Sequence, residues 1–159
     1  MKVCILGLWH LGTVTAACLA SGGHHVTGLD FDETVITNLK KGQPPLFEPG
    51  LDDLVKKGIQ SGTLDFSTDP AQAMSQAKVI WVAYDTPVDD DDNADVNYVI
   101  ERVGKLFPHL KSGQEVLISS QLPVGTSAHL EKLFAKARPN LQVSFSYSPE
   151  NLRLGKAIS

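Results

Sequence analysis

A turn bounded by two glycines, close to the amino terminus, carries residues whose types and spacing suit phosphate binding. It reads Gly7-Leu8-Trp9-His10-Leu11-Gly12 and follows an apolar run at residues 3–6. A dinucleotide-binding turn has the pattern G-x-G-x-x-G, in which the first glycine permits a tight turn and the third a close approach of helix to strand. Gly7 and Gly12 occupy these two positions. The free N–H groups of a helix that starts here suit a phosphate, so the turn predicts a dinucleotide site.

Two residues inside this turn need separate consideration. Trp9 stands where the second glycine normally lets backbone N–H groups approach the pyrophosphate. Its indole would crowd the phosphate unless the ring points away and φ stays negative. His10 could bring a protonated ring to the pyrophosphate, although an exposed side chain without that role is the simpler expectation. The cofactor contacts predicted from this turn are Gly7, Trp9, His10, Leu11 and Gly12.

A single acid ends the second predicted strand. Residues 25–30 read as this strand, and Asp30 is its last residue. A carboxylate at such a place accepts hydrogen bonds from the ribose hydroxyls of an adenosine and repels a 2′-phosphate. Asp30 is therefore predicted to bind the cofactor and to favour NAD over NADP. The alternative interpretation is a surface aspartate in a strand–helix turn that holds no ligand.

Polar or proline-containing loops follow three later strands. They are Thr86-Pro87, residues 119–123 and residues 148–151. In open α/β sheets, ligands bind outside the carboxyl ends of the strands. Each loop taken alone could be a simple turn, but three loops at one edge of a sheet predict a shared cleft.

The elements that must position these residues alternate between strands and helices. Strands are predicted over residues 3–6, 25–30, 63–67, 79–83, 115–119 and 141–147. Helices are predicted over residues 11–21, 32–39, 51–57, 96–110 and 125–137, with another beginning at Asp69-Pro70. Asp32, Asp69 and Asp95 are expected to cap the helices that follow them. This alternation predicts an α/β fold with a doubly wound parallel sheet, the Rossmann type.

Other clusters of polar residues do not predict a site. The acidic run at residues 89–92 lacks the glycine and closing glutamate of a calcium loop, so we expect a solvated loop. The histidines have no spacing that suits a metal. Cys4 and Cys18 lie in apolar stretches and are expected to be buried and reduced, as in a cytoplasmic protein. No metal site is predicted.

Length and charge narrow the class of protein. The chain has 159 residues, a net charge of −4 and a pI of about 5.7. Residues 1–159 are predicted to be one dinucleotide-binding domain. The absence of a basic patch argues against nucleic acid as a partner, and no apolar stretch reaches the roughly 18 residues of a membrane span. The chain stops in what could be the start of a helix, so we expect it to be one domain of a longer chain.

Several of these segments resemble one enzyme family, the UDP-glucose/GDP-mannose dehydrogenases. The most specific match is residues 40–51, which are similar to the family's N-K-G-x-x-P-x-x-E-P-G-L segment. Further matches follow in order at Thr86-Pro87, Ala94-Asp95, residues 123–126 and residues 148–153. The resemblance runs the length of the chain and ends about where the family's NAD-binding domain ends.

The resemblance implies an activity and residue roles. Such enzymes use NAD to oxidise the C6 alcohol of a nucleotide sugar to a carboxylate in two steps. A cysteine of a later domain, absent from this chain, forms the covalent intermediate. Glu150 matches the glutamate that assists water in hydrolysis, and Thr86 a cofactor-contacting threonine. Glu48 falls in the E-P-G loop and is expected to be structural or substrate-facing. The full-length family members tend to be homodimers.

Three positions depart from the family pattern. Gln121 replaces a threonine beside the nicotinamide, Leu154 replaces a second glutamate, and Trp9 replaces the second glycine. Gln121 is still predicted to lie at the cofactor. These departures leave open a stand-alone, non-catalytic nucleotide-binding module. Another NAD-dependent enzyme with a related fold, such as a hydroxyacid dehydrogenase, is a further alternative, which the E-P-G-L loop and residues 149–153 argue against.

Overall fold

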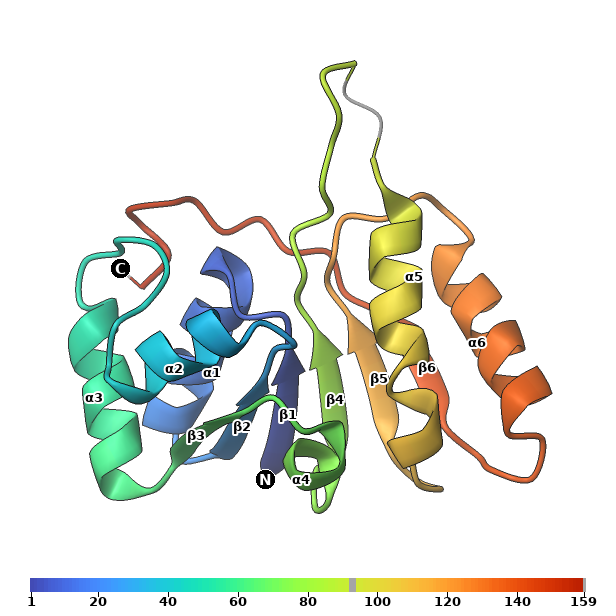
Figure 1. Cartoon of the computed structure of the whole chain (residues 1–159), viewed down its shortest axis with the longest axis horizontal. Coiled ribbons are helices and arrows are strands. Elements are labelled where there is room, and N and C mark those ends of the chain that lie inside the picture. The colour runs from blue at the N-terminus through green and yellow to red at the C-terminus, as the bar shows by residue number, and fades with distance from the viewer. Residues whose placement is uncertain (92–93, 159) are drawn as a thin grey trace.

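Six parallel strands form the centre of the molecule in a computed structural model that describes residues 1–91 and 94–158. The strands lie in the order β3-β2-β1-β4-β5-β6 (Figure 1). Their order reverses between β1 and β4, which is where such sheets bind dinucleotides. The predicted doubly wound α/β fold is confirmed. The bounds are β1 Lys2–Leu6, β2 His25–Leu29, β3 Leu64–Ser67, β4 Val79–Val82, β5 Glu115–Ile118 and β6 Ser144–Tyr147.

Helices cover both faces of this sheet. Along β1, Val3 and Ile5 pack into one apolar core, whereas Cys4 and Leu6 pack into the other. Because side chains alternate along a strand, a strand buried on both faces reads as a continuous apolar run. On the Val3 face lie α1 His10–Ser21, α2 Glu33–Lys40 and α3 Leu51–Ser61; on the Cys4 face lie α4 Pro70–Met74, α5 Val96–Gly104, η1 Phe107–His109 and α6 Thr126–Ala137.

Aspartates begin three helices, as expected. The Asp32 carboxylate accepts hydrogen bonds from the backbone N–H groups of Thr34 and Val35. Asp69 does the same for Ala71, and Asp95 for Tyr98. Each carboxylate satisfies N–H groups that have no partner within the helix.

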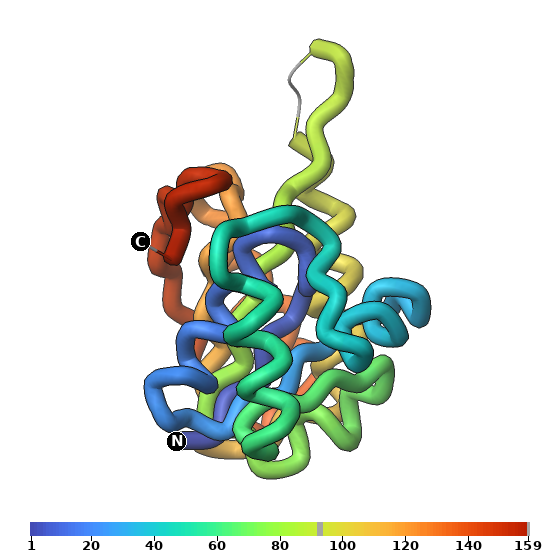
Figure 2. The backbone as a smooth tube through the Cα atoms, turned by 90° about the vertical axis from the view of Figure 1, so that its left-hand side faces the viewer, coloured from blue at the N-terminus to red at the C-terminus, as the bar shows by residue number. Residues whose placement is uncertain are grey.

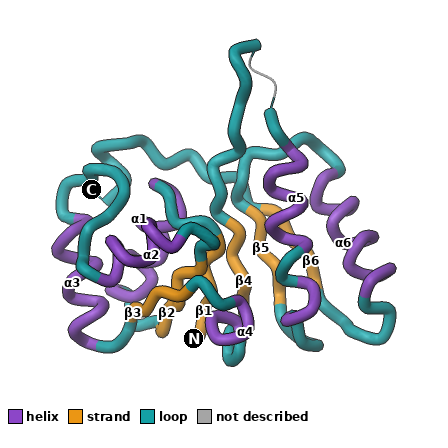
Figure 3. The backbone as a smooth tube through the Cα atoms, in the orientation of Figure 1, coloured by secondary structure: helices purple, strands orange, loops and turns teal. Residues whose placement is uncertain are grey.

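The loops that carry the candidate site gather at one end of the sheet. Figure 3 shows loops over the carboxyl ends of the strands, and the segment after β6 runs back across them toward α3. The same arrangement is visible from the side, where the loop after β4 projects beyond the rest of the molecule (Figure 2). Of the acidic run, Asp92 lies outside the described residues.

Some sequence-based boundaries are wrong. The strand predicted over residues 141–147 is only Ser144–Tyr147, because its one neighbour, β5, begins at Glu115 and pairs it with Ser144. The helix predicted over 96–110 ends at Gly104, and Pro108 lies in the 3₁₀ turn that follows. The helix predicted over 51–57 continues to Ser61, where a left-handed Gly62 ends it. The remaining differences are one or two residues.

Cys18 corrects a further expectation. Cys4 is fully buried in the sheet as predicted, but Cys18 is exposed, because it lies on the solvent side of α1. Among the described residues, no helix is long and apolar enough to cross a membrane.

Candidate functional site

The turn between β1 and α1 requires glycine at both of its ends. Gly7 has a φ of +90°, and a Cβ on it would lie 2.7 Å from Cδ1 of Tyr84. A Cβ on Gly12 would lie only 1.7 Å from the carbonyl oxygen of Gly7. The first turn of α1 is therefore pressed directly onto the end of β1. These are the steric roles expected of the first and third fingerprint glycines.

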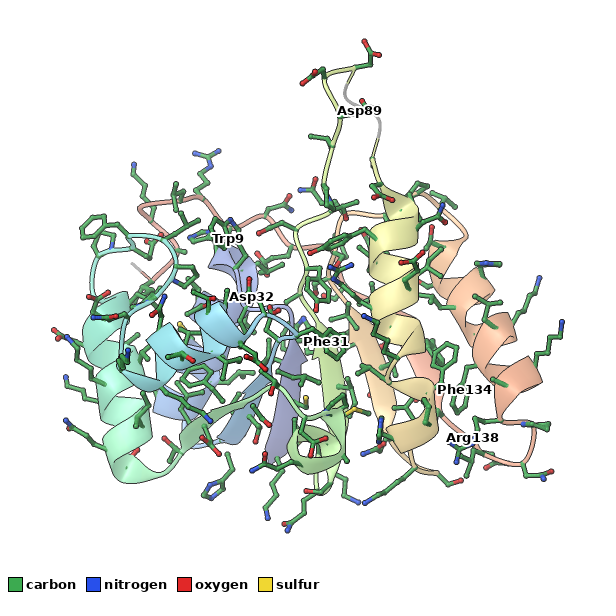
Figure 4. The ribbon with its side chains drawn as sticks, in the orientation of Figure 1. Trp9, Phe31, Asp32, Asp89, Phe134 and Arg138 are labelled. Atoms are coloured by element: carbon green, nitrogen blue, oxygen red, sulfur yellow. The ribbon has the colours of Figure 1, made fainter. Side chains whose placement is uncertain are left out.

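Trp9 occupies its place in the turn with a negative φ. Its φ is −81°, a value that any residue adopts, so the turn does not need glycine here. The indole is 47% exposed and lies at the upper end of the sheet, above Asp32 in the view of Figure 4. In the described chain no side chain caps the start of α1. The helix therefore keeps N–H groups available for an anion.

Asp30 is bound to the same turn. One carboxylate oxygen accepts a hydrogen bond of 2.8 Å from the backbone N–H of Leu8, and the other accepts one of 3.1 Å from Asp32. Asp30 thus ties the end of β2 to the phosphate turn. Each oxygen retains a lone pair for a further donor, because a carboxylate oxygen can accept two hydrogen bonds.

Two cavities open on either side of this turn. The first, of about 370 Å³, we call the Asp30 cavity; the second, of about 310 Å³, we call the Glu150 cavity. Both are bordered by the segment Tyr84-Asp85-Thr86. The Asp30 cavity is further lined by Leu8, Trp9, Asp30, Asp32, Val35, Pro87 and Tyr98, and the Glu150 cavity by His10, Leu11, Val88, Ser119, Ser120, Gln121, Glu150 and Leu152.

Hydrogen bonds hold the three loops of the Glu150 cavity together. The Thr86 hydroxyl donates to the carbonyl of Gln121 at 2.7 Å, which joins the loops after β4 and β5. The Ser119 hydroxyl donates to the carbonyl of Ser148 at 2.7 Å and accepts a hydrogen bond from the Trp81 indole. The expectation that these loops share one cleft is confirmed.

His10 differs from its expectation. The ring is 12% exposed rather than a free surface group, and its Nε2 lies 3.0 Å from a carboxylate oxygen of Glu48. Glu48 is itself buried and accepts two backbone hydrogen bonds, 2.7 Å from Gly155 and 2.9 Å from Ala157. Of the two expectations for Glu48, the structural one is observed. The contact was not foreseeable because these residues lie far apart in sequence.

The ionisation of two acids near the turn reflects this arrangement. Burial raises the pKa of Glu48, but the hydrogen bonds from His10, Ala157 and Gly155 outweigh it, and the pKa lies below its ordinary value. Burial also raises the pKa of Asp85, which the nearby His10 opposes. Glu48 is therefore a stable anion beside the phosphate turn.

Comparisons with known proteins agree with this geometry. A profile of the "UDP-glucose/GDP-mannose dehydrogenase family, NAD binding domain" matches residues 1–159. The chain belongs to this family. It is 38% identical to a UDP-glucose 6-dehydrogenase of Rhizobium meliloti, over 99% of this chain and 36% of that protein. It is 30% identical to a GDP-mannose 6-dehydrogenase of Pseudomonas syringae, over 99% of this chain and 38% of that protein.

A solved structure supports the same assignment to the family's NAD-binding domain. A ternary complex of GDP-mannose dehydrogenase from Pseudomonas aeruginosa superposes with a TM-score of 0.93, at 28% identity. The match covers 99% of this chain and 38% of that one. The chain thus spans a little over a third of the length of these relatives.

The residues present fit NAD, the cofactor of this domain family. The uncapped start of α1 lies between two cavities of nucleoside size, and the Asp30 carboxylate borders one of them. The buried hydroxyl of Ser120 has no hydrogen-bond partner within the described chain, and this residue borders the Glu150 cavity. Polar groups left unpaired in a cleft are typical of a ligand site.

The structure brings together every predicted site residue. Trp9 and Asp30 border the Asp30 cavity, and Gly7 and Gly12 shape the turn beside it. The rest, His10, Leu11, Thr86, Gln121 and Glu150, border the Glu150 cavity. Sequence reasoning did not single out Tyr84 or Asp85, and it included Ser120 only as part of the loop at residues 119–123. Their position at the ends of the fourth and fifth predicted strands was the available signal.

Proposed function

We propose that this chain binds NAD across the phosphate turn and forms the cofactor-binding part of a nucleotide-sugar 6-dehydrogenase. The observation that carries the proposal is the pair of cavities that flank the start of α1 and share the segment Tyr84-Asp85-Thr86. A dinucleotide consists of two nucleosides joined by a pyrophosphate, and this arrangement offers one place for each part.

The Asp30 cavity suits the adenosine. Trp9, Val35 and Tyr98 supply apolar and aromatic walls for a base, and Asp30 supplies acceptors for ribose hydroxyls. A 2′-phosphate would meet the negative charges of Asp30 and Asp32. This cavity therefore favours NAD over NADP.

The Glu150 cavity suits the nicotinamide and the reacting sugar. Bound NAD would accept a hydride from the C6 carbon of a nucleotide sugar. Thr86 and Gln121 would position the nicotinamide ring. The Glu150 carboxylate accepts a 2.7 Å hydrogen bond from the backbone N–H of Asn151. As a general base, it would take a proton from the water that hydrolyses the covalent intermediate and so releases the acid product. The nucleophilic cysteine would come from a later domain, since neither Cys4 nor Cys18 borders either cavity.

The setting of the whole protein is also part of the proposal. We expect a homodimer in the cytoplasm that acts on a sugar nucleotide. Free cysteines at Cys4 and Cys18 agree with a reducing compartment. The relatives act, by their names, on UDP-glucose or GDP-mannose, so both sugar nucleotides are candidates.

A non-catalytic nucleotide-binding module is the second candidate. Gln121, with its longer side chain, borders the Glu150 cavity at the place where the family has a threonine. A module of this kind would bind NAD but turn over no sugar nucleotide. Turnover of UDP-glucose or GDP-mannose by the full-length protein would exclude it.

Calorimetric titration with NAD and NADP tests the proposed site. Saturable NAD binding and much weaker NADP binding are expected. Asp30→Asn keeps the shape of the side chain but removes its charge. It should therefore lower the affinity for NAD and reduce the preference for NAD over NADP. Asp53→Ala, an exposed position on α3, should change neither. Failure of NAD to bind, or an unchanged preference in Asp30→Asn, would contradict the proposal.

A further inference from the structure

The cleft proposed to hold NAD is unusually acidic for a site that receives a pyrophosphate. Four carboxylates border its two cavities: Asp30, Asp32, Asp85 and Glu150. Among the described residues that line them, His10 is the only basic one. The chain as a whole carries a net charge of −4, so its overall field does not attract an anion either.

His10 lies where the pyrophosphate would pass. It is the first residue of α1 and borders the Glu150 cavity, while its neighbour Trp9 borders the Asp30 cavity. A dinucleotide with one nucleoside in each cavity must cross the turn between these two residues. Its pyrophosphate would then lie beside the His10 ring and the N–H groups of the helix start.

Glu48 determines the orientation of the His10 ring. It occupies Nε2 at 3.0 Å, which leaves Nδ1 for another partner. Glu48 itself cannot move freely, because it is buried and accepts hydrogen bonds from Gly155 and Ala157. In a protonated imidazole both ring nitrogens are donors, so Nδ1 can donate to an anion while Nε2 stays with Glu48.

We propose that His10 is a pyrophosphate ligand in this chain, and that Glu48 is the positioning residue that fixes the orientation of its ring. The inference rests on the proposed NAD site and adds to it a cationic side chain. Dinucleotide turns of the G-x-G-x-x-G type rely on backbone N–H groups. Here Trp9 replaces the glycine that brings those groups closest, and the next residue supplies a charge instead.

The consequence is an affinity for NAD that depends on pH. An imidazole loses its charge between pH 5 and 8, so the attraction to a pyrophosphate weakens as the pH rises. The other ionisable groups facing His10 are carboxylates, Glu48, Asp85 and Glu150. Carboxylates ordinarily titrate at lower pH. Two cationic side chains belong to neighbouring segments: Lys156 lies in the segment that Glu48 holds, and the Arg102 guanidinium stacks on the Tyr98 ring at 3.3 Å.

The experiment is a series of NAD titrations between pH 6.5 and 8.5. The affinity of the unaltered chain should fall about tenfold, as expected when one charge-assisted contact is lost. His10→Gln should bind weakly, with an affinity that changes little with pH. His10→Arg keeps a positive charge, so its NAD affinity should also change little with pH. It should bind NAD more tightly than His10→Gln does. Glu48→Gln should lose part of the pH dependence of the NAD affinity.

Controls separate this effect from other titrating groups. His129→Gln, at an exposed position on α6, should keep the full pH dependence of the NAD affinity. Circular dichroism establishes that each variant is folded. Inorganic pyrophosphate gives a second readout on the unaltered chain at pH 6.5: it should shift the Cε1–H resonance of His10 and leave that of His129 in place.

The outcomes distinguish this inference from the proposed function. NAD binding of constant affinity across the pH range would overturn the role of His10 and leave the NAD site standing. A slope that persists in His10→Gln, or a His10 resonance unmoved by pyrophosphate, would also overturn it. Absence of NAD binding at every pH would overturn the proposed function and this inference with it.

Discussion

The Glu48 carboxylate accepts a 2.9 Å hydrogen bond from the backbone N–H of Ala157, which lies 109 residues later in the chain. Leu152, Ala157 and Ile158 pack against the same apolar core as α1. The buried acid therefore joins the E-P-G loop, the start of α1 and the returning segment after β6. Glu150 lies in the loop that leads into this segment, so the position of the proposed general base depends on an acid in another loop.

Lowering the pH should release the segment after β6 from Glu48. Hydrogen bonds lower the pKa of Glu48, so its ionised form contributes stability above the ordinary pKa of a glutamate and loses it as the pH falls through the lowered value. The amide resonances of Gly155 and Ala157 should therefore shift as the pH is reduced from 6 to 3. In Glu48→Gln, these two amide resonances should already have their low-pH positions at pH 6. An exposed acid replaced on α6, Glu131→Gln, should leave the transition unchanged; shifts that persist in Glu48→Gln would contradict the assignment.

Gly12 should tolerate no side chain. Gly12→Ala places a Cβ 1.7 Å from the Gly7 carbonyl oxygen, so helix and strand must separate, and unfolding should become easier by at least about 3 kcal/mol. Gly104 is the matched control, because a Cβ there meets nothing within 4 Å and its φ is not positive. Gly104→Ala should be neutral or stabilise by about 0.5 kcal/mol. Urea unfolding of both variants decides this, and similar midpoints for the two would refute it.

The sheet and the phosphate turn could be predicted because each depends on neighbouring residues. A strand buried on both faces is a local apolar run, and Gly7 and Gly12 restrict the backbone wherever they stand. The cap at Asp32 is local in the same sense. Asp30 could be placed at the turn because in a Rossmann sheet the second strand lies beside the first.

The partner of His10 could not be predicted for the opposite reason. Glu48 lies 38 residues from His10 and 107 from Gly155, and the three meet only when the returning segment crosses the sheet. No pattern in the sequence shows that crossing. The buried state of Tyr84 and Ser120 also depends on how loops pack, and the start of β6 depends on where β5 begins.

Trp9 should report on cofactor binding. Its half-exposed indole borders the Asp30 cavity, so an adenine in that cavity would contact it and quench its fluorescence. The only other tryptophan, Trp81, donates to the Ser119 hydroxyl and does not itself line either cavity. NAD should quench the emission of Trp81→Phe, in which Trp9 remains, and have little effect on Trp9→Phe. Equal quenching of both variants would place the adenine elsewhere.

Two adjacent serines at the end of β5 should differ in what they contribute. The Ser119 hydroxyl is buried and makes two hydrogen bonds, to Ser148 and from Trp81. Ser119→Ala leaves both partners unsatisfied and should lower the free energy of unfolding by about 1–2 kcal/mol. The Ser120 hydroxyl is as deeply buried but has no partner within the described chain, so Ser120→Ala should be nearly neutral. If Ser120 instead serves the ligand, Ser120→Ala will weaken NAD binding without changing the urea midpoint. An equal loss of stability in both variants would show that Ser120 has a structural partner as Ser119 does.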